Sequence, residues 1–201
     1  MRFHTSVSEQ GAELVRLVDK SFHLQHIKLA ENTFVCDCSY VVERNNTIIF
    51  VVGASSAYKH WGNEKYFELG SLVRAKGYNP LFLLGPAEKK YAEQIKNAGF
   101  EYLTDVNFKQ IAAMMISRKV KAVAGNDTGI MHMACAFDTP SVTVSVGGSH
   151  FTWFPYDQKK HKLCYPECAH VKCMNKCTEV LTCQSKISVQ SVYENLMSLL
   201  S

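Results

Sequence analysis

The chain has 201 residues, of which 47% are hydrophobic, with a formal net charge of +4 and eight cysteines. Such a chain can bury the core of one principal domain, and its mild charge without blocks of like sign gives no indication of a nucleic-acid partner. No apolar run approaches the ~20 residues of a membrane span, and the first residues lack the hydrophobic stretch of a secretion signal. We therefore expect a cytoplasmic protein, whose small basic excess suits a nucleotide-sugar or an anionic lipid surface.

Residues 1–47 differ in pattern from the rest of the chain. Gln10 to Ala30 has apolar residues at helical spacing, which predicts an amphipathic helix. Phe34 to Val42 reads as an extended segment, followed by a polar turn. We interpret 1–47 as a helix with an extended linker and 48–201 as the folded domain.

From Ile48 onward, short apolar runs alternate with helical patterns. The predicted strands are Ile48–Val52, Leu81–Leu84, a short strand near Tyr102, Lys121–Ala124 and Ser141–Val146. The predicted helices are Glu64–Ala75, Ala87–Asn97, Phe108–Ser117, Ile130–Phe137 and Val189–Leu200. Repeated strand-then-helix units indicate an α/β fold, with a Rossmann-like parallel sheet flanked by helices.

The loop after the first predicted strand carries small residues, the hydroxyls of Ser55 and Ser56, and the amine of Lys59. In an open α/β sheet this loop lies at the carboxyl edge, where ligands bind, and a lysine there offers a point charge to a diphosphate. The alternative is a solvated surface lysine. The chain contains neither a Walker loop nor GxGxxG, which argues against a dinucleotide oxidoreductase.

A second junction, from Ala124 to Ala134, turns from a strand into a helix. Unpaired backbone N–H groups at a helix start favour an anion by ~0.3–1 kcal/mol. Asp127 or Thr128 suits the helix cap, and Gly129 allows close approach of a ligand. The alternative is a simple N-cap, with His132 packed in the core.

Five cysteines fall between residues 164 and 183, so this segment is cysteine-rich. The spacing of Cys164, Cys168, Cys173 and Cys177 would let four thiolates surround one structural Zn²⁺, although the usual zinc signal is CxxC. A cytoplasmic location disfavours disulfides. Reduced thiols, structural zinc and disulfides all remain open.

Four motifs follow one another at the intervals of strand–helix units: Gly53–Ser56 with Lys59–Trp61, Leu84–Glu88, Gly125–Gly129 with His132 and Ala134, and Phe154–Tyr156. In this order they resemble the motifs of glycosyltransferase family 9, which contains the ADP-heptose:lipopolysaccharide heptosyltransferases. The resemblance covers Ile48 to Leu200. It implies the carboxyl-terminal, donor-binding domain of a two-domain GT-B enzyme.

The resemblance implies a nucleotide-diphosphate sugar as ligand, ADP-heptose above all, transferred with inversion to a lipopolysaccharide core or related glycan without a required cofactor. Ser55, Ser56, Lys59, Thr128 and Gly129 would contact the diphosphate, Asp127 and His132 would hold the sugar or organise the turn, and Glu88 would bind the ribose. From the residues alone, Glu88 serves equally as a first-turn acid that complements a helix dipole.

The same resemblance places the acceptor site and the acidic general base in an amino-terminal domain, for which residues 1–47 are too short. No catalytic residue is therefore assigned. One reading is an enzyme, or its donor half, working at the inner face of the inner membrane. Another is a non-catalytic or split-subunit binding module that needs a partner to supply the acceptor domain. A third is a cysteine-centred metal protein.

Overall fold

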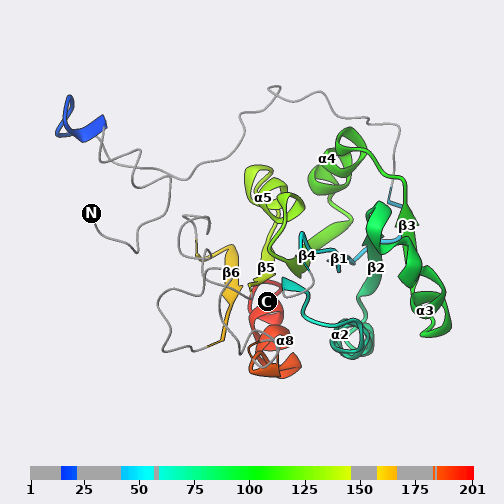
Figure 1. Cartoon of the computed structure of the whole chain (residues 1–201). Helices are drawn as coiled ribbons and strands as arrows, with labels where there is room; N and C mark the ends of the chain where they lie inside the picture. The colour runs from blue at the N-terminus through cyan, green and yellow to red at the C-terminus, as the bar shows by residue number, and fades with distance from the viewer. Residues whose placement is uncertain (1–14, 22–41, 57–58, 146–157, 167–182, 184) are drawn as a thin grey trace.

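The computed structural model describes residues 15–21, 42–56, 59–145, 158–166, 183 and 185–201. They contain a six-stranded sheet of order β3-β2-β1-β4-β5-β6, in which every neighbouring pair is parallel (Figure 1). The strands are β1 (Thr47–Val51), β2 (Asn79–Leu84), β3 (Glu101–Thr104), β4 (Val120–Asn126), β5 (Ser141–Val144) and β6 (His161–Cys164). The predicted α/β fold with a parallel sheet is confirmed.

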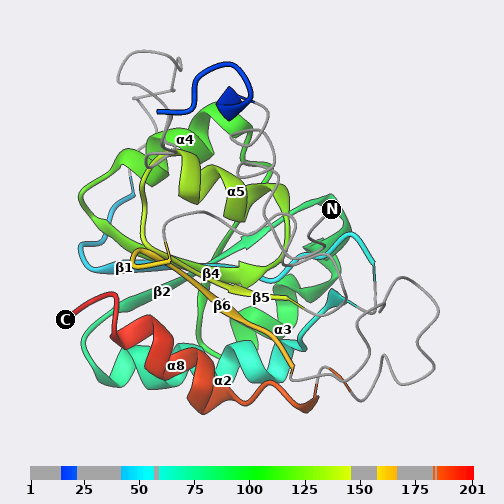
Figure 2. The ribbon, with the colours of Figure 1, turned by 90° about the vertical axis from the view of Figure 1, so that its left-hand side faces the viewer.

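Helices cover both faces of this sheet. The helices are α2 (Asn63–Ala75), α3 (Ala92–Asn97), α4 (Phe108–Ile116), α5 (Gly129–Ala136) and α8 (Val189–Met197), with a 3₁₀ helix, η2 (Pro86–Tyr91). Figures 1 and 2 show α4 and α5 on one face of the sheet and α2 and α8 on the other. In the part of the chain that the structure describes, no helix combines the length and hydropathy that crossing a bilayer requires.

Strand β1 shows why its sequence is continuously apolar. Ile48 and Phe50 pack into the core beneath α2 and α8, whereas Ile49 and Val51 pack into the core beneath α4. Because both faces are covered, successive side chains that point in opposite directions are all buried. The strand therefore lies at the centre of the molecule, and its carboxyl end carries the first of the loops predicted to bind a ligand.

The predicted helix Ala87–Asn97 divides into two pieces. Its first part is the 3₁₀ helix η2, in which the Glu88 N–H donates to the Gly85 carbonyl at 3.1 Å, and only Ala92–Asn97 is α-helical. Pro86 occupies the first position of η2. Proline has no backbone N–H, but the N–H at this position would have no acceptor within the helix, so no hydrogen bond is lost. Glu88 therefore lies in the first turn of a 3₁₀ helix and not of an α-helix.

The helix predicted over Gln10 to Ala30 is wrong where the structure describes it. Only Val15 and Arg16 are helical, and the next residues turn. The Ser21 N–H and hydroxyl both donate to Asp19 Oδ1, at 2.9 and 2.6 Å, and such local bonds compete with a helix. Within residues 15–21 the apolar side chains are exposed, 79% for Leu17 and 93% for Val18, so packing does not stabilise a helix over this described part. The remainder of that helix, and the extended segment except Val42, lie outside the described residues.

Strand β6 was not predicted at all. Its four residues include two basic side chains and show no apolar run, so it reads as part of the cysteine segment. In the structure His161 is 1% exposed, and its Nδ1 lies 2.9 Å from the hydroxyl of Ser141 on β5. The strand thus depends on its pairing with β5, and this pairing cannot be predicted from the local sequence pattern.

Candidate functional site

A cavity of about 500 Å³ opens at the carboxyl ends of β1 and β4. The chain runs outward from β1 to β3 and then returns to place β4 on the other side of β1, so the strand order reverses between these two strands. Open α/β sheets bind ligands at this point, because the loops that follow the two strands separate in opposite directions. Seven of the eight predicted site residues line the cavity: Ser55, Lys59, Glu88, Asp127, Thr128, Gly129 and His132.

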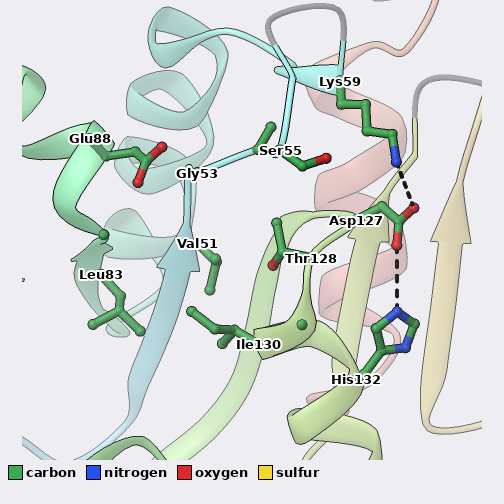
Figure 3. Close-up of a pocket in the computed structure, with 13 residues that line it drawn as sticks. Val51, Gly53, Ser55, Lys59, Leu83, Glu88, Asp127, Thr128, Ile130 and His132 are labelled. Atoms are coloured by element: carbon green, nitrogen blue, oxygen red, sulfur yellow. Dashed lines mark ion pairs between the residues drawn. The ribbon is translucent and has the colours of Figure 1, made fainter. Parts of the chain in front are cut away.

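Charged groups meet on one side of this cavity. Asp127 lies between two basic side chains, with its Oδ2 3.9 Å from Lys59 Nζ and its Oδ1 3.8 Å from His132 Nε2 (Figure 3). The carboxylate is only 16% exposed, and the lysine 21%. Lys59 is therefore not the solvated surface lysine of the alternative interpretation. His132 is 46% exposed, so its interpretation as a core residue is also wrong.

Glu88 lies on the opposite side of the cavity, where its carboxylate is folded over two glycines. A Cβ added at Gly53 would stand 3.0 Å from Glu88 Cδ, and one added at Gly85 would stand 2.6 Å from Oε2. Any larger residue at either position would displace the carboxylate. The absence of side chains at these two glycines therefore keeps Glu88 at the cavity wall.

The start of α5 also lines the cavity. Thr128 is its N-cap, with extended backbone, and its carbonyl accepts the first helical hydrogen bond from the Met131 N–H at 3.0 Å. The expected capping by the Thr128 side chain is wrong, because its hydroxyl bonds to no backbone N–H of the helix. Among the described residues this buried Oγ1 has no hydrogen-bond partner, although Thr128 itself lines the cavity.

Ser56 is the predicted residue that does not line the cavity. Its carbonyl accepts a hydrogen bond from the Lys59 N–H at 2.9 Å, so its backbone is tied to a residue that does line the cavity. Adjacent hydroxyls in a sequence thus end in different environments, which spacing alone does not reveal.

Sequence reasoning missed three apolar residues of the site. Val51, Leu83 and Ile130 line the cavity beside the charged groups. Each lies at the end of a strand or in the first turn of a helix, where an apolar residue is usually read as core. They give the cavity an apolar wall that suits a flat or nonpolar part of a ligand.

From the sequence, no function was assigned to two further residues beside the site, Asn126 and His60. Asn126 is fully buried and makes four hydrogen bonds to the loop after β1 and to α2. His60 accepts a hydrogen bond from the Gly62 N–H through Nδ1 at 3.1 Å. Burial lowers the pKa of His60, although the nearby carboxylate of Glu88 opposes this effect. A polar residue that follows an apolar strand was the available signal for Asn126.

The cysteine cluster is described only in part. Cys164 ends β6, and burial raises the pKa of its thiol to about 11, while the Asn195 amide donates to its sulfur at 3.5 Å. Cys168, Cys173 and Cys177 lie outside the described residues, as do Phe154–Tyr156 of the fourth motif. Across the described ranges no three His, Cys, Asp or Glu residues form a group that could hold a metal ion. The structural zinc therefore stays a prediction.

Comparisons with known proteins bear on the fold and the family. Among solved structures, the Escherichia coli ADP-heptose lipopolysaccharide heptosyltransferase II has a TM-score of 0.65 at 19% identity, covering 86% of this chain and 52% of that chain. A glycosyltransferase family 9 protein from Veillonella parvula has a TM-score of 0.74 at 18% identity, and the match covers 100% of this chain and 61% of that protein. E. coli heptosyltransferase WaaC, solved with ADP-2-deoxy-2-fluoro heptose, has a TM-score of 0.59 at 22% identity, and the match covers 78% of this chain and 44% of that protein.

The chain thus spans about half the length of these solved relatives, and at such identities the likeness shows the fold alone. It confirms the predicted Rossmann-like fold of a GT-B heptosyltransferase. No curated protein matches the chain. The sequence profile described as glycosyltransferase family 9 (heptosyltransferase) matches residues 13–182, and so begins well before the Ile48 expected from the motifs. Since this match covers most of the sequence, the chain belongs to glycosyltransferase family 9, the heptosyltransferase family.

Proposed function

We propose that the cavity between β1 and β4 binds a nucleotide-diphosphate sugar, with ADP-heptose as the expected donor. The observation that carries this proposal is that Lys59 and Thr128, from two loops far apart in the sequence, line one cavity. Parallel strands bring the two loops to the same edge of the sheet. Lys59 supplies a cation and the start of α5 supplies backbone N–H groups, and together they suit a diphosphate.

The chemistry of sugar transfer gives each group a role. As the bond between the anomeric carbon and the diphosphate breaks, negative charge develops on the phosphate oxygens, and nearby donors stabilise it. In the proposal, Lys59 and the backbone N–H groups at the start of α5 supply this stabilisation. Asp127 contacts Lys59 only at 3.9 Å, so a diphosphate oxygen can replace it as the nearer partner. Ser55 contributes a hydroxyl from the same loop, and Asp127 and His132 then face the sugar.

The nucleoside part is assigned to the opposite wall of the cavity. The Glu88 carboxylate accepts hydrogen bonds from the ribose hydroxyls in this proposal, and the apolar residues Val51, Leu83 and Ile130 contact the flat base. The solved relatives support the choice of nucleotide, because WaaC is described with ADP and with an ADP-heptose analogue. The acceptor is proposed to be a lipopolysaccharide core or a related glycan.

Calorimetric titration tests the binding step. Purified protein is titrated with ADP, UDP and GDP under the same conditions, and we expect heat from ADP with saturation at one site. UDP or GDP binding more tightly than ADP would change the assignment of the nucleotide. The absence of heat from all three would overturn the proposed function.

Binding without transfer is the second candidate function. Of the two cavity carboxylates, Asp127 already lies between Lys59 and His132, and Glu88 is assigned to the ribose in the proposal above. We propose that the general base for inverting transfer comes from an acceptor-binding half, in a longer chain or in a partner. Product formation from ADP-heptose, measured with and without an amino-terminal half supplied from a relative, distinguishes the two. Transfer that needs the added half supports the split enzyme, and no transfer in either case supports the binding module.

A further inference from the structure

Asn126 occupies the place where β1 and β4 separate. The backbone ladder between these strands ends with the pair Val51 and Gly125, one residue earlier. Beyond it, Asn126 Nδ2 donates to the carbonyl of Val52 at 2.7 Å and to that of Gly53 at 3.3 Å. The side chain therefore extends the ladder into the loop after the backbones have diverged.

The oxygen of the same amide holds the other end of this loop. Asn126 Oδ1 accepts a hydrogen bond from the Trp61 N–H at 3.1 Å and another from the Tyr66 hydroxyl at 3.0 Å. An asparagine side chain has two N–H donors and two acceptor lone pairs, and all four are used here. The side chain is 0% exposed, so no water competes for these bonds.

We propose that Asn126 is a positioning residue for the diphosphate site, and this inference rests on the proposed function. It ties both described ends of the loop that carries Ser55 and Lys59, and the next residue in the chain is Asp127. One rigid amide thus sets how far Lys59 stands from the start of α5. Asn126 does not itself line the cavity, so its effect on a ligand passes through the loop.

Asparagine suits this position better than other side chains of its size. Aspartate would turn a third oxygen toward the carbonyls of Val52 and Gly53, and threonine offers a single hydroxyl in place of four hydrogen bonds. Since the groups left behind are buried, each lost bond leaves a polar atom without a partner. The loop would then move to find other partners and would change the spacing of the cavity.

The test compares Asn126→Thr with Tyr66→Phe. Both variants are uncharged and remove hydrogen bonds at the same amide, but only Asn126→Thr releases the two carbonyls of the loop. ADP affinity is measured by calorimetry well below the melting temperature of each variant, so that every sample is folded. We expect Asn126→Thr to weaken ADP binding about tenfold or more, because small misplacements of binding groups are costly. Tyr66→Phe should lower the melting temperature while its ADP affinity stays within about twofold of the parent chain.

The outcomes separate the inference from the proposed function. A parent chain that binds no ADP overturns the proposed function, and the inference falls with it. A parent chain that binds ADP, with Asn126→Thr binding as tightly, overturns the inference alone. Equal losses of affinity in the two variants would reduce Asn126 to a general stabilising role and also overturn it. If Asn126→Thr does not fold, Asn126→Gln keeps the amide but displaces it by one methylene, and the same loss of affinity is expected.

Discussion

At the scale of single residues, Asp127 and the proposed ligand would compete for the charged amine of Lys59. Its Nζ lies 3.9 Å from Asp127 Oδ2, longer than a direct charge-assisted hydrogen bond, and the carboxylate is shared with His132. A ligand oxygen at a shorter distance would therefore gain more than the pair loses. Lys59 is the residue whose removal tests the proposed diphosphate contact most directly.

Lys59→Ala should weaken ADP binding by about 1.5–3 kcal/mol, because one charge-assisted hydrogen bond to the diphosphate is lost. The measurement is calorimetric titration with ADP. Lys96→Ala is the matched control, since Lys96 lies on α3 and lines a different cavity, away from the site. Unchanged ADP affinity in Lys59→Ala, or an equal loss in Lys96→Ala, would show that the diphosphate does not contact this loop.

His60 makes stability depend on pH. Burial lowers its pKa from the ordinary 6.5, with Glu88 and Glu64 opposing the shift and Lys90 adding to it. Protonation of Nδ1 would also break the hydrogen bond from the Gly62 N–H. Below pH 6.5 the unfolded chain takes up a proton that the folded chain resists, so stability is lost as pH falls from 6.5 toward the folded pKa. Above pH 6.5 both the folded and the unfolded chain keep His60 neutral, so the stability that depends on its neutral form is fully present.

His60→Asn should flatten that part of the pH profile. The asparagine oxygen can accept from the Gly62 N–H in place of Nδ1, but it does not titrate. Denaturant unfolding at several pH values gives the free energy of unfolding, which should fall less steeply below pH 6.5 in the variant than in the parent chain. Parallel profiles for the parent chain and His60→Asn would contradict the assignment.

At the scale of secondary-structure elements, Gly125 allows β4 to lie against β1. A Cβ at this position would stand 2.6 Å from both the Cβ and the carbonyl oxygen of Val51 and 3.1 Å from Met131 Sδ. The clash involves backbone, which cannot rotate away. The motif that carries Gly125 is therefore a packing requirement as well as a binding signature.

Gly125→Ala should destabilise the fold by about 1–3 kcal/mol through overpacking between the two strands. Gly129→Ala is the comparison, because an added Cβ there meets nothing within 4 Å. Thermal and denaturant unfolding measure both variants. If Gly125→Ala were as stable as Gly129→Ala, the close approach of β1 and β4 would not hold in solution.

The elements that sequence predicted well are those buried on both faces. Ile48–Val52 was placed within one residue of β1, because a continuous apolar run needs no knowledge of its neighbours. Strand β6 was missed, since HKLC becomes a strand only through its pairing with β5. The helix predicted around Val18 is wrong for the opposite reason. Its apolar spacing predicts a buried face, but Leu17 and Val18 are exposed.

At the scale of the whole molecule, the order of strands decides which loops meet. The sequence predicted that the loops after β1 and β4 share one edge, because parallel strands have their carboxyl ends together, and the cavity confirms it for Lys59 and Thr128. It could not separate Ser55 from Ser56, or find the hydrogen bonds of Asn126. Those depend on the register and turn geometry that only the assembled sheet fixes.

The ligand should stabilise the whole fold, because its site joins elements from both halves of the sheet. At ADP concentrations about 100 times the dissociation constant, linkage predicts about 2.7 kcal/mol of added stability. For a chain of this size that raises the melting temperature by about 5–10 °C, measured by differential scanning calorimetry. AMP, which lacks the second phosphate, should give a smaller shift at equal concentration, and Lys59→Ala should reduce the ADP shift toward that of AMP. Equal shifts from ADP and AMP would mean that the second phosphate is not bound, and the diphosphate site would have to be abandoned.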